Sequence, residues 1–168
     1  GKNKFNFELN KTDKSAGYSI VAIADPQPKG KAHFKKFAGK PLEDVCQTAK
    51  GLENMAVGLV LGDICWDNLE LLESYKSEIV RTGIPFYPVV GNHDHDRNAQ
   101  GDLATTAAYR SSLGPENYAF YLGNDVVIVV DNIIYDTDKK YKEGYADHVL
   151  AWVKKLVDQL PEDADLYI

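Results

Sequence analysis

Three short apolar segments, each followed at once by polar residues, constrain the fold of this chain more than any other feature. Residues 18–24, 57–61 and 85–90 have the length and composition of buried β-strands. Each ends in turn formers and in side chains with oxygen or imidazole groups: Asp25-Pro26-Gln27, Gly62-Asp63 and Gly91-Asn92-His93-Asp94. This pattern predicts a functional site built from the ends of strands.

Amphipathic helices are predicted between these strands. Apolar residues recur at spacings of three and four over residues 42–56 and 69–80. The alternation of strand and helix predicts an α/β fold with a largely parallel sheet. Because the carboxyl ends of parallel strands lie along one edge of a sheet, we expect Asp25, Asp63 and Asn92 to converge there.

The second half of the sequence predicts an antiparallel hairpin and a long helix. Residues 118–122 and 125–131 flank Gly123-Asn124, a pair typical of two-residue hairpin turns. Apolar residues in 146–160 give the clearest helical pattern of the chain. The fold is therefore predicted to combine parallel and antiparallel strands.

The chain is predicted to be a single domain that ends early. Its length of 168 residues suits one domain with a hydrophobic core. Residues 1–17 form a lead-in with an edge strand at 5–9, and residues 18–168 form the N-terminal part of the domain. Residues 164–168 begin a strand with no successor, so we expect a truncated domain whose free strand edge allows self-association.

Charge and composition exclude several classes of protein. The net charge is −6 and no long basic run is present, so we do not expect binding to a nucleic-acid backbone. No apolar stretch is long enough to span a membrane. Cys46 and Cys65 do not have the spacing of a zinc knuckle or a redox pair, and we interpret them as core residues. The compartment stays open, with a lean towards an exported or periplasmic location.

The polar residues at the strand ends have the chemistry of metal ligands. Carboxylate, amide and imidazole groups suit hard or borderline divalent cations. The ordered series Asp-x-Gln, Gly-Asp and Gly-Asn-His-Asp resembles the calcineurin-like metallophosphoesterase family over residues 18–168. The resemblance implies a four-layer α/β/β/α sandwich with mixed sheets, of which this chain supplies the part on the N-terminal side.

The resemblance also implies two divalent metal ions and assigns ligands to them. Asp25 and Gln27 would bind the first ion, Asp63 would bridge both, and Asn92 would bind the second. Gln27 stands where many family members have histidine. An amide oxygen is a harder ligand than imidazole, so manganese, magnesium or iron is favoured over zinc.

The implied reaction is hydrolysis of a phosphomonoester or phosphodiester, either a small molecule or a phosphoprotein. A hydroxide activated by the two metals would attack phosphorus without a covalent enzyme intermediate. His93 would assist the leaving group, and Asp94 would orient the ring of His93. The enzyme class expected of the parent protein is therefore a phosphoric ester hydrolase.

Two alternatives compete with this interpretation. The downstream histidine and the Gly-His-x-His motif of the family are absent from the sequence, and His148 lies in the long helical pattern and cannot replace them. The chain is therefore alternatively a catalytically silent metal-binding or structural fragment. A flavodoxin-like nucleotide-binding domain also fits the strand–helix order, but the sequence has no Gly-rich phosphate loop.

Several residues near the motifs have two interpretations. Trp66 and His95 are candidates for the wall of the pocket, whereas Asp67 either lies beside the metal ligands or caps the following helix. The lysines of residues 29–40 form either a solvated loop or a rim that attracts phosphate.

Overall fold

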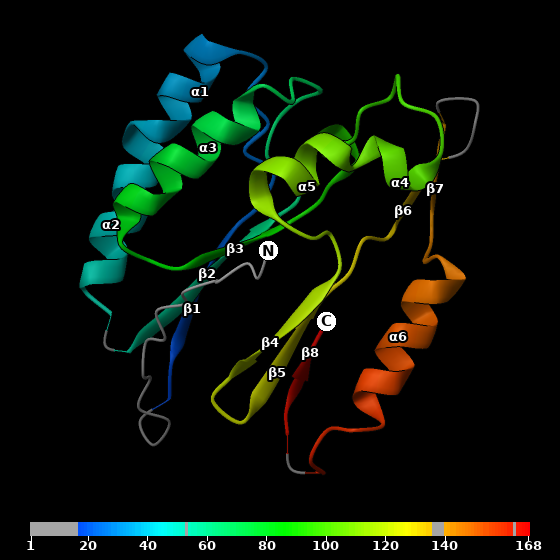
Figure 1. Ribbon diagram of the computed structural model, residues 1–168. Coiled ribbons are helices and arrows are strands. Elements are labelled where there is room, and N and C mark those ends of the chain that lie inside the picture. Colours follow the sequence, from blue (N-terminus) through cyan, green and yellow to red (C-terminus); the bar gives the residue numbers. More distant parts are fainter. Residues whose placement is uncertain (1–16, 53, 136–139, 163) are drawn as a thin grey trace, which may run out of the picture.

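The computed structural model describes residues 17–52, 54–135, 140–162 and 164–168. It has a mixed α/β architecture with three small sheets (Figure 1). The edge strand expected at residues 5–9 lies outside the described residues. In the described part of the chain, no helix is long and apolar enough to cross a membrane.

The first sheet is parallel and carries the predicted strand ends. Its strands lie side by side in chain order: β1 (Ser19–Ile23), β2 (Met55–Leu61) and β3 (Phe86–Val89). Ile23 pairs with Val60, and Leu61 pairs with Val89. The carboxyl ends of all three strands therefore reach the same edge, as the sequence predicted.

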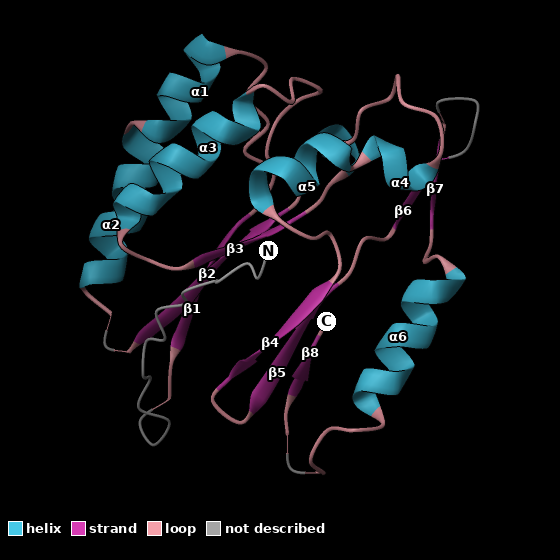
Figure 2. Ribbon diagram, in the orientation of Figure 1, coloured by secondary structure: helices cyan, strands magenta, loops and turns pink. Residues whose placement is uncertain are grey.

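Three helices cover one face of this sheet (Figure 2): α1 (Lys31–Ala38), α2 (Lys40–Lys50) and α3 (Leu71–Ile79), which continues into η2 (Val80–Thr82). The helix α1 replaces the loop that we expected between residues 29 and 40. Phe34 and Phe37, one turn apart, pack into the core between the helices and the sheet. Burial of these two rings outweighs the many lysines, which lie on the exposed side of the helix.

The second sheet contains the predicted hairpin: β4 (Tyr118–Leu122) pairs antiparallel with β5 (Asp125–Val129), and β8 (Leu166–Tyr167) lies parallel to β5. Gly123 in the turn has a φ of 74°, which glycine adopts without strain. The hairpin and the strand within residues 164–168 are confirmed.

The remaining elements flank the two larger sheets: α4 (Asp102–Thr105), α5 (Ala107–Leu113), a small sheet of β6 (Ile133–Tyr135) and β7 (Tyr141–Glu143), and α6 (Asp147–Val157). The strands β6 and β7 were not predicted, because three residues are too few to give a periodic pattern. The long helix was predicted correctly.

The two larger sheets pack against each other through a second hydrophobic cluster. Val57 of β2 meets Val127 and Val129 of β5, and the rings of Tyr87 and Phe120 stack 3.9 Å apart. Alternate residues of the first sheet thus face the helices on one side and the second sheet on the other. This packing on both faces fixes the first sheet and the edge that carries the site.

Candidate functional site

The three strand ends meet at Asp63, which follows β2. The backbone N–H of Gln27 donates to the carbonyl of Asp63 (3.1 Å), and the Gln27 side-chain amide donates to Asp63 Oδ2 (2.6 Å). From the other side, the backbone N–H of His93 donates to Asp63 Oδ1 (3.1 Å). Asp63 is therefore the residue that joins the loops after β1 and β3.

Two glycines make this close approach possible. A Cβ on Gly91 would lie 2.2 Å from the backbone nitrogen of Asp63 and 2.3 Å from Asp63 Oδ1. Gly62 has a φ of +80°, and a Cβ there would lie 3.1 Å from the Cα of Gly91. Any larger residue at position 91 would push the strand ends apart, which explains the glycine that begins Gly-Asn-His-Asp.

Unusual backbone conformations gather at the same edge. Asp25, Gln27, Asp63 and Asp67 have φ values between 44° and 55°, in the left-handed region that disfavours residues with a Cβ. Such conformations cost of order 1 kcal/mol each and persist where the surroundings impose them. These conformations are concentrated in the loops after β1 and β2, next to the Asp63 contacts.

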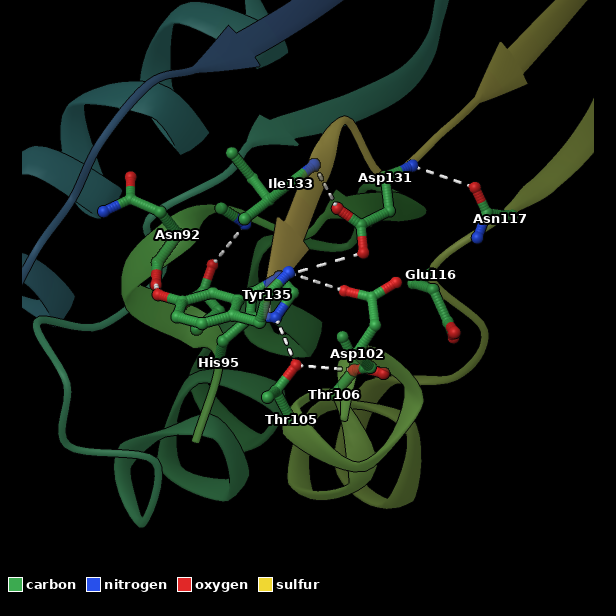
Figure 3. A network of polar contacts seen from close by, with 12 residues as sticks. Asn92, His95, Asp102, Thr105, Thr106, Glu116, Asn117, Asp131, Ile133 and Tyr135 are labelled. Carbon is green, nitrogen blue, oxygen red and sulfur yellow. Dashed lines mark hydrogen bonds and ion pairs between the residues drawn. The ribbon is translucent and has the colours of Figure 1, made fainter. Parts of the chain in front are cut away.

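Asp25 and Asn92 flank the Asp63 contacts. Asp25 is exposed and lies two residues before Gln27, on the loop that binds Asp63. Asn92 precedes His93, and its carbonyl accepts a hydrogen bond from the Tyr135 hydroxyl (2.9 Å). Figure 3 shows the Asn92 side-chain amide pointing away from the buried cluster around His95.

The residues at this edge fit a divalent cation in their chemistry. Asp63 is 7% exposed, and its carboxylate accepts hydrogen bonds from the neutral N–H groups of Gln27 and His93. A buried carboxylate is unfavourable without stronger compensation, which a divalent ion supplies. The other donors, from Asp25, Gln27 and Asn92, are oxygens. Within the described residues no three His, Cys, Asp or Glu side chains form a metal-binding group, so the set depends on its two amides.

His93 is held by three neighbours. Its Nδ1 lies 2.8 Å from Asp67 Oδ1, and its ring stacks on Trp66 with the centroids 3.9 Å apart. Arg97 Nη2 lies 3.0 Å from the same Asp67 oxygen. Because a carboxylate only accepts hydrogen bonds, Nδ1 carries the proton and Nε2 is left for chemistry. Trp66, which the sequence suggested as a pocket wall, thus stacks on the ring of His93.

The partner of His93 is Asp67, where we had expected Asp94. Asp67 does not cap the following helix either, because α3 has no side-chain cap. Adjacency in sequence misled the prediction: the short helix η3 (Asn92–Asp94) turns the Asp94 side chain away from the His93 ring and towards the backbone of the neighbouring loop. The sequence feature that pointed to Asp67 as a residue of the site was its position four residues after Asp63.

Asp94 holds the loops together. Its carboxylate accepts backbone N–H groups of Ile64 (3.1 Å), Cys65 (3.0 Å) and Gly91 (2.9 Å). Burial raises the pKa of Asp94 to about 6, although the hydrogen bonds from the backbone oppose the shift. Cys65 is buried beside it, and burial raises the pKa of its thiol, in keeping with the predicted core role.

His95 lies in a buried polar cluster and not on the pocket wall that we had considered (Figure 3). The Thr105 hydroxyl donates to the Asp102 carbonyl (2.6 Å), so it accepts from His95 Nδ1 (2.7 Å). The unprotonated Nε2 then faces Asp131 Oδ2 at 3.8 Å. Burial lowers the pKa of His95 to about 4 and raises that of Asp131 to about 7. The pair is therefore neutral in mildly acidic solution.

Sequence reasoning missed Arg97, Tyr135 and Asp131. Arg97 is four residues after His93 and could have been noticed as a cation beside the motif. Tyr135 and Asp131 come from the region of β6, far along the chain, and no local pattern points to them. They reach the site only through tertiary packing.

Replacement of Asp131 by asparagine is expected to change how stability depends on pH. In the native protein the raised pKa of Asp131 makes the free energy of unfolding fall as pH rises from about 4 to about 7. The Asp131→Asn protein has no carboxyl group at this position and lacks this loss. The difference in free energy of unfolding between variant and native protein should therefore shift by about 1–2 kcal/mol in favour of the variant when the pH is raised from 5 to 8. Urea unfolding at both pH values measures the difference, with exposed Asp158→Asn as the control. If the difference in unfolding free energy between native and variant protein is the same at both pH values, the pKa of Asp131 is not raised.

Comparisons with known proteins add no assignment to this geometry. Neither a family model nor a curated protein matches the chain. The functional interpretation therefore depends on the residues and contacts at the edge of the first sheet.

Proposed function

We propose that this chain carries part of the dinuclear site of a calcineurin-like metallophosphoesterase that hydrolyses phosphomonoesters or phosphodiesters. The observation that carries the proposal is the junction at Asp63, which receives hydrogen bonds from Gln27 and His93. The three motifs that resemble the family are thereby in contact with one another, as a shared site requires.

The chain would hold its metal ions through Asp25, Gln27, Asp63 and Asn92. These are hard oxygen donors, so manganese, iron or magnesium is favoured over zinc. When bound, two divalent ions would activate water and neutralise charge on the phosphoryl group. Asp63, the most central carboxylate of the set, is the residue suited to lie between them.

His93 would act on the leaving group. The Asp67 carboxylate fixes its Nδ1–H, and stacking on Trp66 fixes the plane of the ring. Nε2 is then the nitrogen that can deliver a proton to the leaving oxygen. Asp94 contributes indirectly, because it holds the loop from which His93 projects.

The fold is proposed to follow the four-layer sandwich of this family. Three layers of that arrangement have counterparts here: the helices α1–α3, the first sheet and the second sheet. The helix α6 runs beside the second sheet in Figure 1, on the side away from the first sheet. Self-association along the edge of β8 stays a proposal of the same kind.

A second candidate is a metal-binding chain without turnover. The histidines other than His93 are poorly placed to complete a dinuclear site: His33 is exposed on α1, His95 is bonded to Thr105, and His148 is exposed on α6. This candidate predicts partial metal occupancy and little hydrolysis.

Hydrolysis by the purified protein with Mn²⁺ tests the proposal. A panel of phosphomonoesters and phosphodiesters should include substrates that turn over, and Asp63→Asn should lower kcat/KM at least about 100-fold, because the junction loses its central anion. Asp158→Asn, at the exposed end of α6, is the matched control. Failure on both ester types, with Mn²⁺ bound, favours the silent candidate and rejects the enzymatic one.

The roles of Asp67 and Asp94 can be separated by two variants. Asp67→Asn should lower kcat by about 10–100-fold with little change in melting temperature, because it weakens the contacts of a partly exposed side chain with the His93 ring and Arg97. Asp94→Asn should chiefly lower the melting temperature, because three backbone N–H groups lose part of their acceptor. Kinetics and thermal unfolding of both proteins give the comparison. The reverse pattern would show that Asp94 is the partner of His93 during catalysis.

A further inference from the structure

Two cationic side chains lie at the stacked rings of Trp66 and His93, Lys29 against Trp66 and Arg97 against His93, and neither belongs to the proposed metal ligands. Lys29 Nζ lies 4.5 Å from the centroid of the Trp66 ring, whose other contact is the stacked ring of His93. Arg97 Nη2 lies 3.1 Å from His93 Nδ1 and 3.0 Å from Asp67 Oδ1. We call Lys29, Trp66 and Arg97 the cationic wall.

Backbone hydrogen bonds hold the cationic wall in place. The N–H of Trp66 donates to the carbonyl of Pro28 (3.1 Å), the residue before Lys29. The N–H of Asp67 donates to the carbonyl of His93 (3.2 Å). The loops after all three strands of the first sheet thus fix the wall relative to the His93 ring.

Lys29 differs from the other lysines of its segment. Four of them are exposed on α1 and α2: Lys31, Lys35, Lys36 and Lys40. Lys29 lies before α1, and its ammonium group rests over an indole at the site. Of the lysines that the sequence suggested as a phosphate-attracting rim, Lys29 is the one placed against a residue of the site.

Arg97 has donor capacity beyond its ion pair. Its Nη2 reaches Asp67, but its Nε is buried and has no hydrogen-bond partner among the described residues. A buried donor without an acceptor is unfavourable. Phosphoryl oxygens are strong acceptors that a guanidinium binds through two parallel hydrogen bonds. The buried Nε itself is not open to a substrate, but the side chain as a whole is 40% exposed, so a phosphoryl group can approach the outer part of the guanidinium.

We propose that the cationic wall makes the site selective for dianionic phosphomonoesters over monoanionic phosphodiesters. The inference rests on the proposed function, because the wall flanks the ring that would face the leaving group. A phosphomonoester carries a charge of about −1.5 to −2 at pH 7, and a diester carries about −1. Lys29 attracts the additional charge, and Arg97, whose charge is partly offset by its ion pair with Asp67, would donate hydrogen bonds to the phosphoryl oxygens. A second ester substituent would in addition replace a charged oxygen that the wall can bind.

Kinetics on two substrates with the same leaving group test the selectivity. Lys29→Gln and Arg97→Gln should each lower kcat/KM for p-nitrophenyl phosphate about tenfold, and for bis(p-nitrophenyl) phosphate about twofold or less. Arg97→Lys should recover part of the monoester activity, because it restores the charge. Lys36→Gln, which removes an exposed lysine of α1, is the control. Equal losses on both esters would mean that the two cations only position His93, and would overturn the proposal.

Binding without metal separates this inference from the proposed function. The full protein in EDTA is titrated calorimetrically with phenyl phosphate and with diphenyl phosphate. The native protein should bind phenyl phosphate more tightly, and Lys29→Gln or Arg97→Gln should reduce that preference about five- to tenfold. If the native protein does not prefer phenyl phosphate over diphenyl phosphate, the proposed role of the cationic wall is wrong, even if the enzyme is active. A preserved preference in a protein without turnover supports the wall and rejects the hydrolytic function.

Discussion

The structure at the edge of the first sheet depends on the burial of one carboxylate, that of Asp63. Burying a carboxylate costs free energy unless donors or cations surround it. Gln27 and His93 bring such donors from the two neighbouring strand ends. Gly91 has no side chain, and a Cβ at this position would clash with Asp63 and keep the strand ends apart. The packing of the sheet between helices and a second sheet makes this convergence possible, because it fixes the register of all three strands.

Two further carboxylates divide the work of supporting His93. Asp94 binds backbone groups and holds the loops, whereas Asp67 binds the ring itself. Arg97 balances the charge of Asp67 and, as proposed, extends the site towards the substrate. The His95 cluster lies behind this arrangement and is largely sealed from water. The carboxylate that positions the His93 ring and the one that holds the loops are thus neighbours with different surroundings.

Much of this arrangement follows from the sequence, and the rest follows from tertiary contacts. Strand periodicity and strand–helix alternation predicted the parallel sheet and the placement of its three strand ends along one edge, since both are consequences of local pattern. The choice of Asp67 over Asp94 could not be predicted, because it depends on how η3 turns. Helix α1 was missed because Phe34 and Phe37 are only two apolar rings among lysines. Tyr135 entered the site from β6, which gives no periodic signal.

Anomalous scattering from crystals grown with Mn²⁺ shows whether Asp63 binds a metal ion, because it locates the ion independently of any activity. We expect density at the Asp63 carboxylate, within coordination distance of donor oxygens from Gln27, Asp25 or Asn92. The Asp63→Asn protein should lose that density under the same conditions. Density only at other positions, or none near Asp63 at saturating Mn²⁺, would contradict the account.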